Sequence, residues 1–71
     1  MRTRMRERRQ KLGLTLFQVA TIIGVRETTV AKWERGEVTP SAEHVLKIAQ
    51  AYRMPWAKLV KEEPKEAPNE D

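Results

Sequence analysis

The side chains that could do chemistry in this sequence are mainly basic, and the parts of a catalytic or metal site are scarce. The chain has one serine, one histidine and no cysteine, and no glycine-rich loop of the kind that cradles phosphates. The single histidine, His44, has no cysteine near it, so we expect neither a metal nor a cofactor. We therefore expect a binding protein and not an enzyme.

Charge is divided unevenly along the 71 residues, whose net charge is +4. Residues 1–61 hold thirteen Lys and Arg against five Asp and Glu, a net +8, whereas residues 62–71 carry a net −4. A basic segment this small indicates a polyanionic partner, with a merely solvated charged face as the alternative. Residues 62–71 contain two prolines and no large apolar side chain, so we expect one domain at 1–61 followed by a disordered acidic tail.

Nothing in the sequence suggests a membrane or an oxidising compartment. The longest apolar run is far short of the roughly 20 residues that a membrane span needs, and no signal-peptide pattern opens the chain. The lack of cysteine fits a reducing compartment. We expect a cytoplasmic protein without membrane contact, and no site for a small-molecule ligand is evident.

Apolar spacing and turn residues predict a chain made of helices. The expected helices lie at about residues 3–11, 16–23, 27–35, 41–52 and 56–60. No pattern of alternating residues competes with them, so the predicted fold class is all-α.

The helices at 16–23 and 27–35 are joined too closely to lie antiparallel. Thr15 and Gln18 form the sequence pattern of a capping box before the first of them, and Gly24 is placed to end it. Two helices with so short a connection cross at a steep angle. Such a unit can present the outer face of its second helix to the major groove of DNA, although any helix corner shares this geometry.

One arginine of the first helix stands on an apolar face. Met1, Met5, Arg9 and Leu12 recur at helical spacing, while the neighbouring arginines at 2, 4, 6 and 8 are expected to face solvent. An unpaired guanidinium inside a core is very costly. Arg9 therefore needs a carboxylate partner.

The sequence resembles the lambda-repressor-like, Cro/C-type (XRE) helix-turn-helix domain over residues 1 to about 60. The matching segments are Gly13-Leu14-Thr15, Val19-Ala20, Gly24-Val25, Thr29-Val30, Trp33-Glu34-Arg35-Gly36, Pro40-Ser41 and Leu46-Lys47-Ile48-Ala49. The resemblance implies a five-helix domain that binds double-stranded DNA in a sequence-specific way as a repressor-like transcriptional regulator. It also implies a homodimer on a near-palindromic operator, with helix 27–35 in the major groove.

The resemblance further implies roles for individual residues. Arg26 and Lys32 would donate to guanine, Glu27 would accept from cytosine, and Thr28 would contact a thymine methyl group. The phosphate contacts would come from Leu16, Phe17, Thr29, Arg35, Thr39 and Ser41. Arg9 would form a structural ion pair with Glu34. The dimer surface would consist of Met54, Trp56, Leu59 and Val60.

The chain departs from the family pattern at several positions. Leu16 stands where a phosphate-binding glutamine is usual, and Phe17 stands where a charged residue is common. Arg26 replaces the Ser or Thr that caps the recognition helix, while Tyr52 and Trp56 replace aliphatic residues. The two apolar residues and the acidic tail leave a second reading open, in which the protein is an antitoxin or an adaptor that keeps the fold and binds a protein partner.

Overall fold

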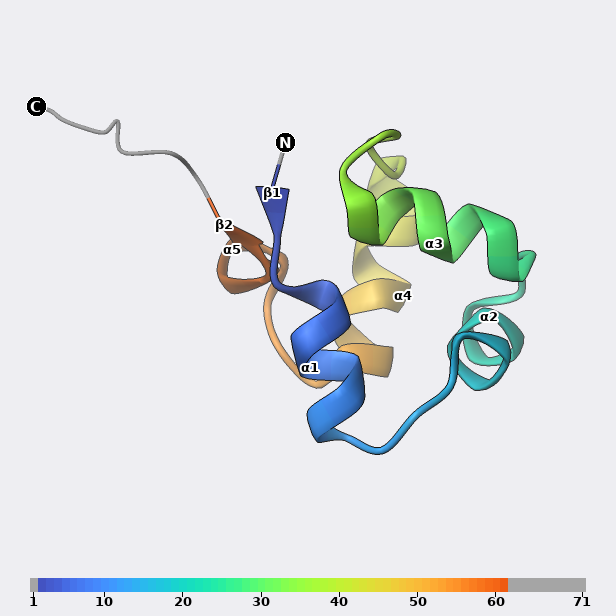
Figure 1. Ribbon diagram of the computed structural model, residues 1–71. Coiled ribbons are helices and arrows are strands. Elements are labelled where there is room, and N and C mark those ends of the chain that lie inside the picture. The colour runs from blue at the N-terminus through green and yellow to red at the C-terminus, as the bar shows by residue number, and fades with distance from the viewer. Residues whose placement is uncertain (1, 62–71) are drawn as a thin grey trace, which may run out of the picture.

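A computed structural model of the protein describes residues 2–61 and contains five helices (Figure 1). They are α1 (Met5–Lys11), α2 (Leu16–Ile23), α3 (Glu27–Arg35), α4 (Ala42–Tyr52) and α5 (Trp56–Leu59). The predicted all-α, lambda-repressor-like class is confirmed, with each expected helix present. The acidic segment 62–71 lies outside the described residues.

The two ends of the described chain meet in a feature that the sequence did not predict. Strand β1 (Arg2–Thr3) pairs antiparallel with strand β2 (Val60–Lys61), and Thr3 lies opposite Val60. The Arg4 amide also donates to the Leu59 carbonyl at 2.6 Å. This pairing explains why α1 begins at Met5 and not at Thr3. Strands of two residues are too short to leave a periodic pattern, and they do not alter the helical class.

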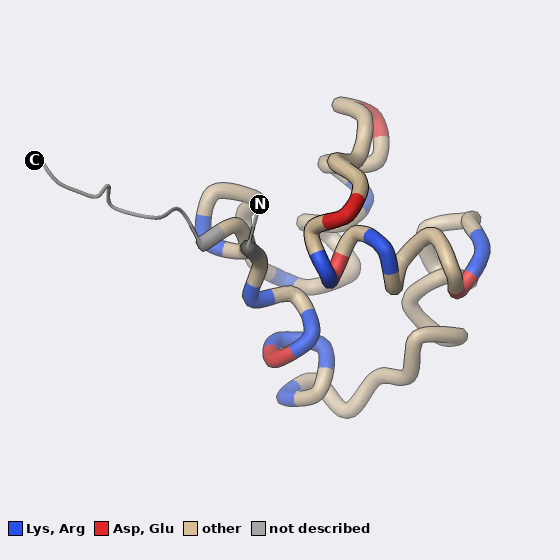
Figure 2. Tube along the Cα trace, turned by 45° about the horizontal axis from the view of Figure 1, so that its top comes forward, with Lys and Arg blue, Asp and Glu red and all other residues tan. Residues whose placement is uncertain are grey.

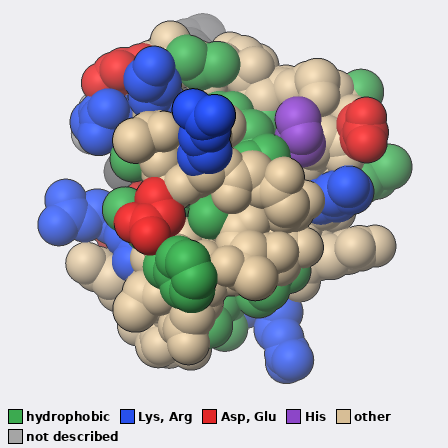
Figure 3. All heavy atoms as spheres, turned by 90° about the vertical axis from the view of Figure 1, so that its right-hand side faces the viewer, with side chains coloured by type: hydrophobic (Ala, Val, Ile, Leu, Met, Phe, Trp, Pro, Cys, Tyr) green, Lys and Arg blue, Asp and Glu red, His purple; other side chains and the backbone are tan. Residues whose placement is uncertain are grey.

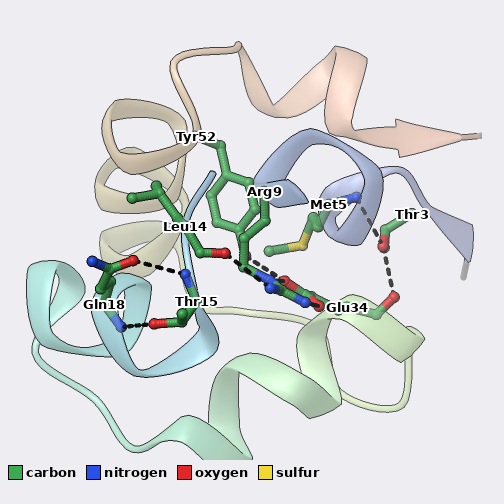
Figure 4. Close-up of polar contacts among 8 residues, drawn as sticks. All are labelled: Thr3, Met5, Arg9, Leu14, Thr15, Gln18, Glu34 and Tyr52. Atoms are coloured by element: carbon green, nitrogen blue, oxygen red, sulfur yellow. Dashed lines mark hydrogen bonds and ion pairs between the residues drawn. The ribbon is translucent and has the colours of Figure 1, made fainter. Parts of the chain in front are cut away.

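Helix α2 begins and ends where its local sequence indicates. The Gln18 amide donates to the Thr15 hydroxyl at 3.0 Å, and the Thr15 amide donates to the Gln18 side chain at 2.9 Å, which completes the capping box (Figure 4). Gly24 ends the helix with a φ of 91°, a left-handed conformation that glycine adopts without steric cost. Because this turn is so tight, only three residues separate the end of α2 from the start of α3.

The core lies where α4 passes behind the other helices, with α1 and α5 on one side and α2 and α3 on the other (Figure 1). Seven large side chains in it are fully buried: Met5, Val19, Val30, Trp33, Ile48, Tyr52 and Leu59. Every helix contributes at least one of them. Helix α3 is therefore anchored through its inner face by Val30 and Trp33.

A bidentate ion pair links α1 to α3 inside this core. The Arg9 guanidinium donates to both carboxylate oxygens of Glu34, at 2.7 and 3.1 Å, and also to the Leu14 carbonyl at 3.1 Å (Figure 4). The side chains of Arg9 and Glu34 are only 11% and 5% exposed. This hydrogen bond with Glu34 raises the pKa of Arg9 above its ordinary value, against the effect of burial. The carboxylate that Arg9 requires is thus the one that the family resemblance implied.

Tyr52 and Thr3 complete the surroundings of Glu34. The Tyr52 hydroxyl donates to a Glu34 carboxylate oxygen at 2.8 Å, and the Thr3 hydroxyl donates to the Glu34 carbonyl at 2.7 Å. Burial, followed by the nearby Glu34 charge, raises the pKa of Tyr52 far above its ordinary value, so the ring stays a neutral hydrogen-bond donor. Tyr52, which the sequence marked only as a change in packing, therefore holds the buried carboxylate in place.

Arg8 has a structural role that differs from the solvent-facing one expected of it. Its guanidinium donates to the carbonyls of Tyr52 and Arg53 at 2.9 and 3.1 Å. These carbonyls belong to the end of α4, where backbone acceptors have no partner within the helix. Arg8 thereby satisfies the carboxyl end of α4 from α1.

Removing either half of the buried pair should cost much of the stability of the domain. We expect Arg9→Ala or Glu34→Ala to lower the free energy of unfolding by about 3–5 kcal/mol, because each leaves a buried charge without its partner. Tyr52→Phe should cost about 1.5–3 kcal/mol, since it removes one hydrogen bond to a charged group. Urea unfolding followed by circular dichroism measures these changes. Arg35→Ala, which breaks an exposed pair, is the control and should stay close to wild type, whereas equal effects of Arg9→Ala and Arg35→Ala would contradict the prediction.

Helix α3 lacks the side-chain cap that α2 has. Arg26 occupies its N-cap position in an extended conformation, with no capping hydrogen bond, as the sequence predicted. We expect Arg26→Ser to raise the free energy of unfolding by about 1 kcal/mol, which is a rise in melting temperature of about 4–8 °C for a domain of this size. Thr15→Ala, which removes an existing cap, should produce a loss of similar size. An unchanged melting temperature in Arg26→Ser would show that the backbone amides in the first turn of α3 already have hydrogen-bond partners.

Candidate nucleic-acid interface

The outer face of α3 is free of packing and carries polar side chains at helical spacing. Val30 and Trp33 bury the inner face, while Glu27, Thr28 and Lys32 are exposed on the other side. These three belong to the predicted base-reading set. Ala31 lies between them on the same stripe and is half-buried, and its small side chain leaves this face without a bulky obstacle.

A first hollow lies beside the start of α3. Its volume is about 520 Å³. The lining residues are Phe17, Ala20, Thr21, Val25, Arg26, Glu27 and Thr28. The structure thus brings three of the four predicted base-reading residues together with Phe17 from α2. Lys32 is not part of this lining, because it lies one helical turn further along α3.

A second hollow, of about 400 Å³, lies between α1, α2 and α3. The lining residues are Thr3, Arg6, Arg9, Leu16, Ala31, Glu34 and Arg35. Leu16 and Arg35 were predicted as phosphate contacts, whereas Arg6 and Ala31 were not. Arg6 precedes the inward-facing Arg9 by three residues, and this spacing places both on one side of α1. The same spacing, read from the sequence, could have identified Arg6 as a member of this site.

The two hollows meet across the amino-terminal end of α2. Leu16 and Phe17 are consecutive, so their side chains point about 100° apart around the helix, one to each hollow. Leu16 is half-buried, whereas Phe17 is 63% exposed. One continuous surface therefore runs from the start of α3, over the start of α2, to α1.

The other predicted phosphate contacts lie in α3 and in the segment between α3 and α4. Thr29 is half-buried in α3, while Thr39 and Ser41 are exposed between α3 and α4. The Ser41 hydroxyl is 3.1 Å from Nδ1 of His44, whose ring lies 5.3 Å from that of Trp33. Ser41 is the N-cap residue of α4 but makes no capping hydrogen bond. Its hydroxyl contacts the His44 side chain and not a backbone amide of the helix.

Arg35 is partly neutralised by its own chain. Its Nε lies 2.5 Å from a Glu37 carboxylate oxygen, and both side chains are more than half exposed. This hydrogen bond raises the pKa of Arg35 and lowers the pKa of Glu37. A phosphate that binds Arg35 has to compete with this carboxylate.

The face that carries the ends of α2 and α3 is mixed in character and not uniformly basic. Figure 3, which turns this side toward the viewer, shows basic, acidic and hydrophobic side chains next to one another. A mixed face suits contacts that differ from position to position, because each base edge presents its own pattern of donors, acceptors and methyl groups.

The predicted dimer surface is corrected at two of its four positions. Leu59 is 0% and Val60 8% exposed within the single chain, so the expectation that they face a partner is wrong. Leu59 turns into the core from α5, and Val60 pairs with Thr3 in the short sheet. Met54 and Trp56 are half-buried and pack on the edge of the core, which leaves part of each accessible.

Residues 2–61 offer neither a metal site nor a membrane span. That part of the chain contains no group of three or more His, Cys, Asp or Glu residues arranged to hold a metal ion. None of its helices has the length and apolarity required to cross a membrane.

Comparison with known proteins identifies the family. Residues 5–59 match a family model described as helix-turn-helix. An uncharacterized HTH-type transcriptional regulator of Archaeoglobus fulgidus is 42% identical over 52 residues, which are 73% of this chain and 74% of that protein. One from Methanothermobacter thermautotrophicus is 41% identical over 51 residues, 72% of this chain and 74% of that protein. The repressor protein C2 of Salmonella phage P22 is 33% identical over 51 residues, but these form only 24% of its length.

A solved structure agrees with these relatives. The crystal structure of the P22 c2 repressor in complex with a synthetic operator aligns with a TM-score of 0.76 and 31% identity, over 82% of this chain and 88% of that one. The chain therefore belongs to the Cro/C-type (XRE) helix-turn-helix family of transcriptional regulators and has the lambda-repressor-like fold.

Proposed function

We propose that the protein recognises a specific sequence of double-stranded DNA with α3 in the major groove and acts as a repressor-like regulator. The observation that carries this proposal is the outer face of α3, where Glu27, Thr28 and Lys32 are exposed while the inner face is fixed in the core. The structural likeness to a repressor solved with its operator supports double-stranded DNA as the partner.

Each exposed side chain of this face matches a feature of a base edge. Arg26 and Lys32 can donate to O6 and N7 of guanine, Glu27 can accept from N4 of cytosine, and the Thr28 methyl group can contact that of thymine. Arg26, Glu27 and Thr28 line one hollow, so they would read neighbouring base pairs. Lys32 would reach a position one helical turn away.

Contacts with the DNA backbone would surround these base contacts and fix the register. Arg35, Thr29, Thr39 and Ser41 carry the hydrogen-bond donors of the proposed phosphate set, while Leu16 and Phe17 can offer only apolar contact with sugars, or their backbone amides. Such contacts supply affinity and salt dependence but carry little sequence information.

Selection from a random pool of duplexes tests sequence-specific binding. We expect a selected site to bind at least about a thousandfold more tightly than the pool, with affinity measured by fluorescence anisotropy. Arg26→Ala and Lys32→Ala should each reduce discrimination at one position by about 1–3 kcal/mol. Lys58→Ala, which removes one charge from α5, is the control and should leave discrimination unchanged. Equal binding of all sequences would contradict the proposal.

We further propose that the protein binds its operator as a homodimer. One nine-residue helix reads only a few base pairs, and a two-fold dimer would place two such helices about 34 Å apart on a near-palindromic site. Met54 and Trp56 remain as the accessible part of the surface implied for this contact.

The dimer should appear as a dependence of affinity on the spacing of half-sites. We expect a duplex with two half-sites one helical turn apart to bind two chains cooperatively, as measured by sedimentation velocity. Inserting about five base pairs, half a turn of DNA, should abolish the cooperativity because it places the half-sites on opposite sides of the duplex. A single bound chain on the correctly spaced duplex would show that the protein acts as a monomer.

Binding to a protein partner, as in an antitoxin or adaptor, is favoured by one observation. Phe17 and Ile22 of α2 are 63% and 58% exposed and line a hollow of about 300 Å³ together with Leu14, Gln18 and Thr21. No charged residue occurs between Leu12 and Val25. Under this function, Ile22→Ser would release the partner and leave DNA affinity unchanged. If selection from the random pool yielded no preferred DNA site, the wild-type protein would still bind its partner.

A further inference from the structure

Helix α1 and its N-cap residue, Arg4, carry basic side chains on two different sides. Arg4, Arg8 and Lys11, which follow one another at spacings of four and three, line a hollow of about 160 Å³ together with Glu7 and Met54. Arg6 and Arg9, three residues apart, line the second hollow described above, beside Leu16, Ala31 and Arg35. Figure 2 shows basic residues along both α1 and α3. The Arg6 side of α1 shares its hollow with Ala31 and Arg35 of α3.

The charges that line this second hollow are largely neutralised by the chain itself. Arg9 is paired with Glu34 in the core, and Arg35 is paired with Glu37 at the surface. Arg6 is exposed, and it forms no ion pair with any residue in the described range 2–61. Within that range, Arg6 is the cation of this hollow that remains without a carboxylate.

Two of the other side chains that line the hollow are apolar. Ala31 of α3 and Leu16 of α2 contribute these apolar side chains to its lining. Ala31 also lies on the same stripe as the proposed base contacts, so a duplex seated on α3 would pass over this hollow. Leu16 cannot donate a side-chain hydrogen bond there, because it is a leucine.

We propose that Arg6 binds a phosphate of the DNA backbone in this hollow and so supplies the side-chain donor that Leu16 lacks. The inference rests on the proposed function, since it places the phosphate beside the groove that α3 would occupy. A guanidinium is suited to this contact because its planar fork donates to two phosphate oxygens at once. Arg6 extends the backbone contacts from α2 and α3 onto α1.

A salt titration of paired charge-removing variants tests this role. Arg6→Gln and Arg4→Gln remove the same charge from the same end of α1, but on different sides of the helix. We expect Arg6→Gln to reduce the slope of log affinity against log salt by about 0.9, and to weaken binding about five- to tenfold at 0.1 M salt. The loss should be equal for the selected site and for random DNA, because a phosphate contact does not read sequence. Arg4→Gln should retain the wild-type slope.

Conservative replacement and folding controls make the result interpretable. Arg6→Lys keeps the charge and should keep most of the slope, and circular dichroism should show unchanged folding for all three variants, since both arginine side chains are exposed. Equal slopes for Arg6→Gln and Arg4→Gln would overturn the inference, and so would a loss in Arg6→Gln that is confined to the selected site. Either result would leave the proposed function intact if wild type still binds its selected site. A wild-type protein without any selected site would overturn the proposed function and this inference together.

Discussion

The buried pair between Arg9 and Glu34 is the interaction on which the rest of this structure depends. A domain of this size has a small apolar core, and it places two charges there at a considerable cost in desolvation. That cost is offset because the pair is bidentate and because Tyr52 and the Leu14 carbonyl satisfy further hydrogen-bonding positions. The result is a fixed link between α1, α3 and α4, which holds α3 near its carboxyl end at Glu34.

Because α3 is attached rigidly through its inner face, its outer face stays free for the proposed recognition of DNA. Val30, Trp33 and Glu34 orient the helix, and none of the exposed residues Glu27, Thr28 and Lys32 is needed for packing. Stability and the proposed specificity therefore depend on different sides of the same nine residues. The cap position of α3 is the exception, because Arg26, a proposed base contact, stands in place of a side chain that would cap the helix.

Local pairing of charges shapes the proposed DNA surface as much as the surplus of basic residues does. The segment 1–61 carries a net charge of +8, yet Glu34 and Glu37 hold two of the arginines around the hollow between α1, α2 and α3, and Arg8 is held by the end of α4. Net charge therefore indicates the class of partner, whereas the distribution of carboxylates decides which cations can reach it.

The sequence by itself determined the five helices, the capping box at Thr15 and Gln18, the turn at Gly24 and the need of Arg9 for a carboxylate, because these depend on neighbours a few residues away or on the cost of one buried charge. The family resemblance supplied Glu34 as the partner and α3 as the proposed reading helix. Only the tertiary structure decided the pairing of β1 with β2, the hydrogen bond from Tyr52 to Glu34, the burial of Leu59 and the place of Arg6 beside Leu16 and Ala31. Each of these joins segments far apart in the chain, and no local spacing records which distant residues the packing of the helices will bring together.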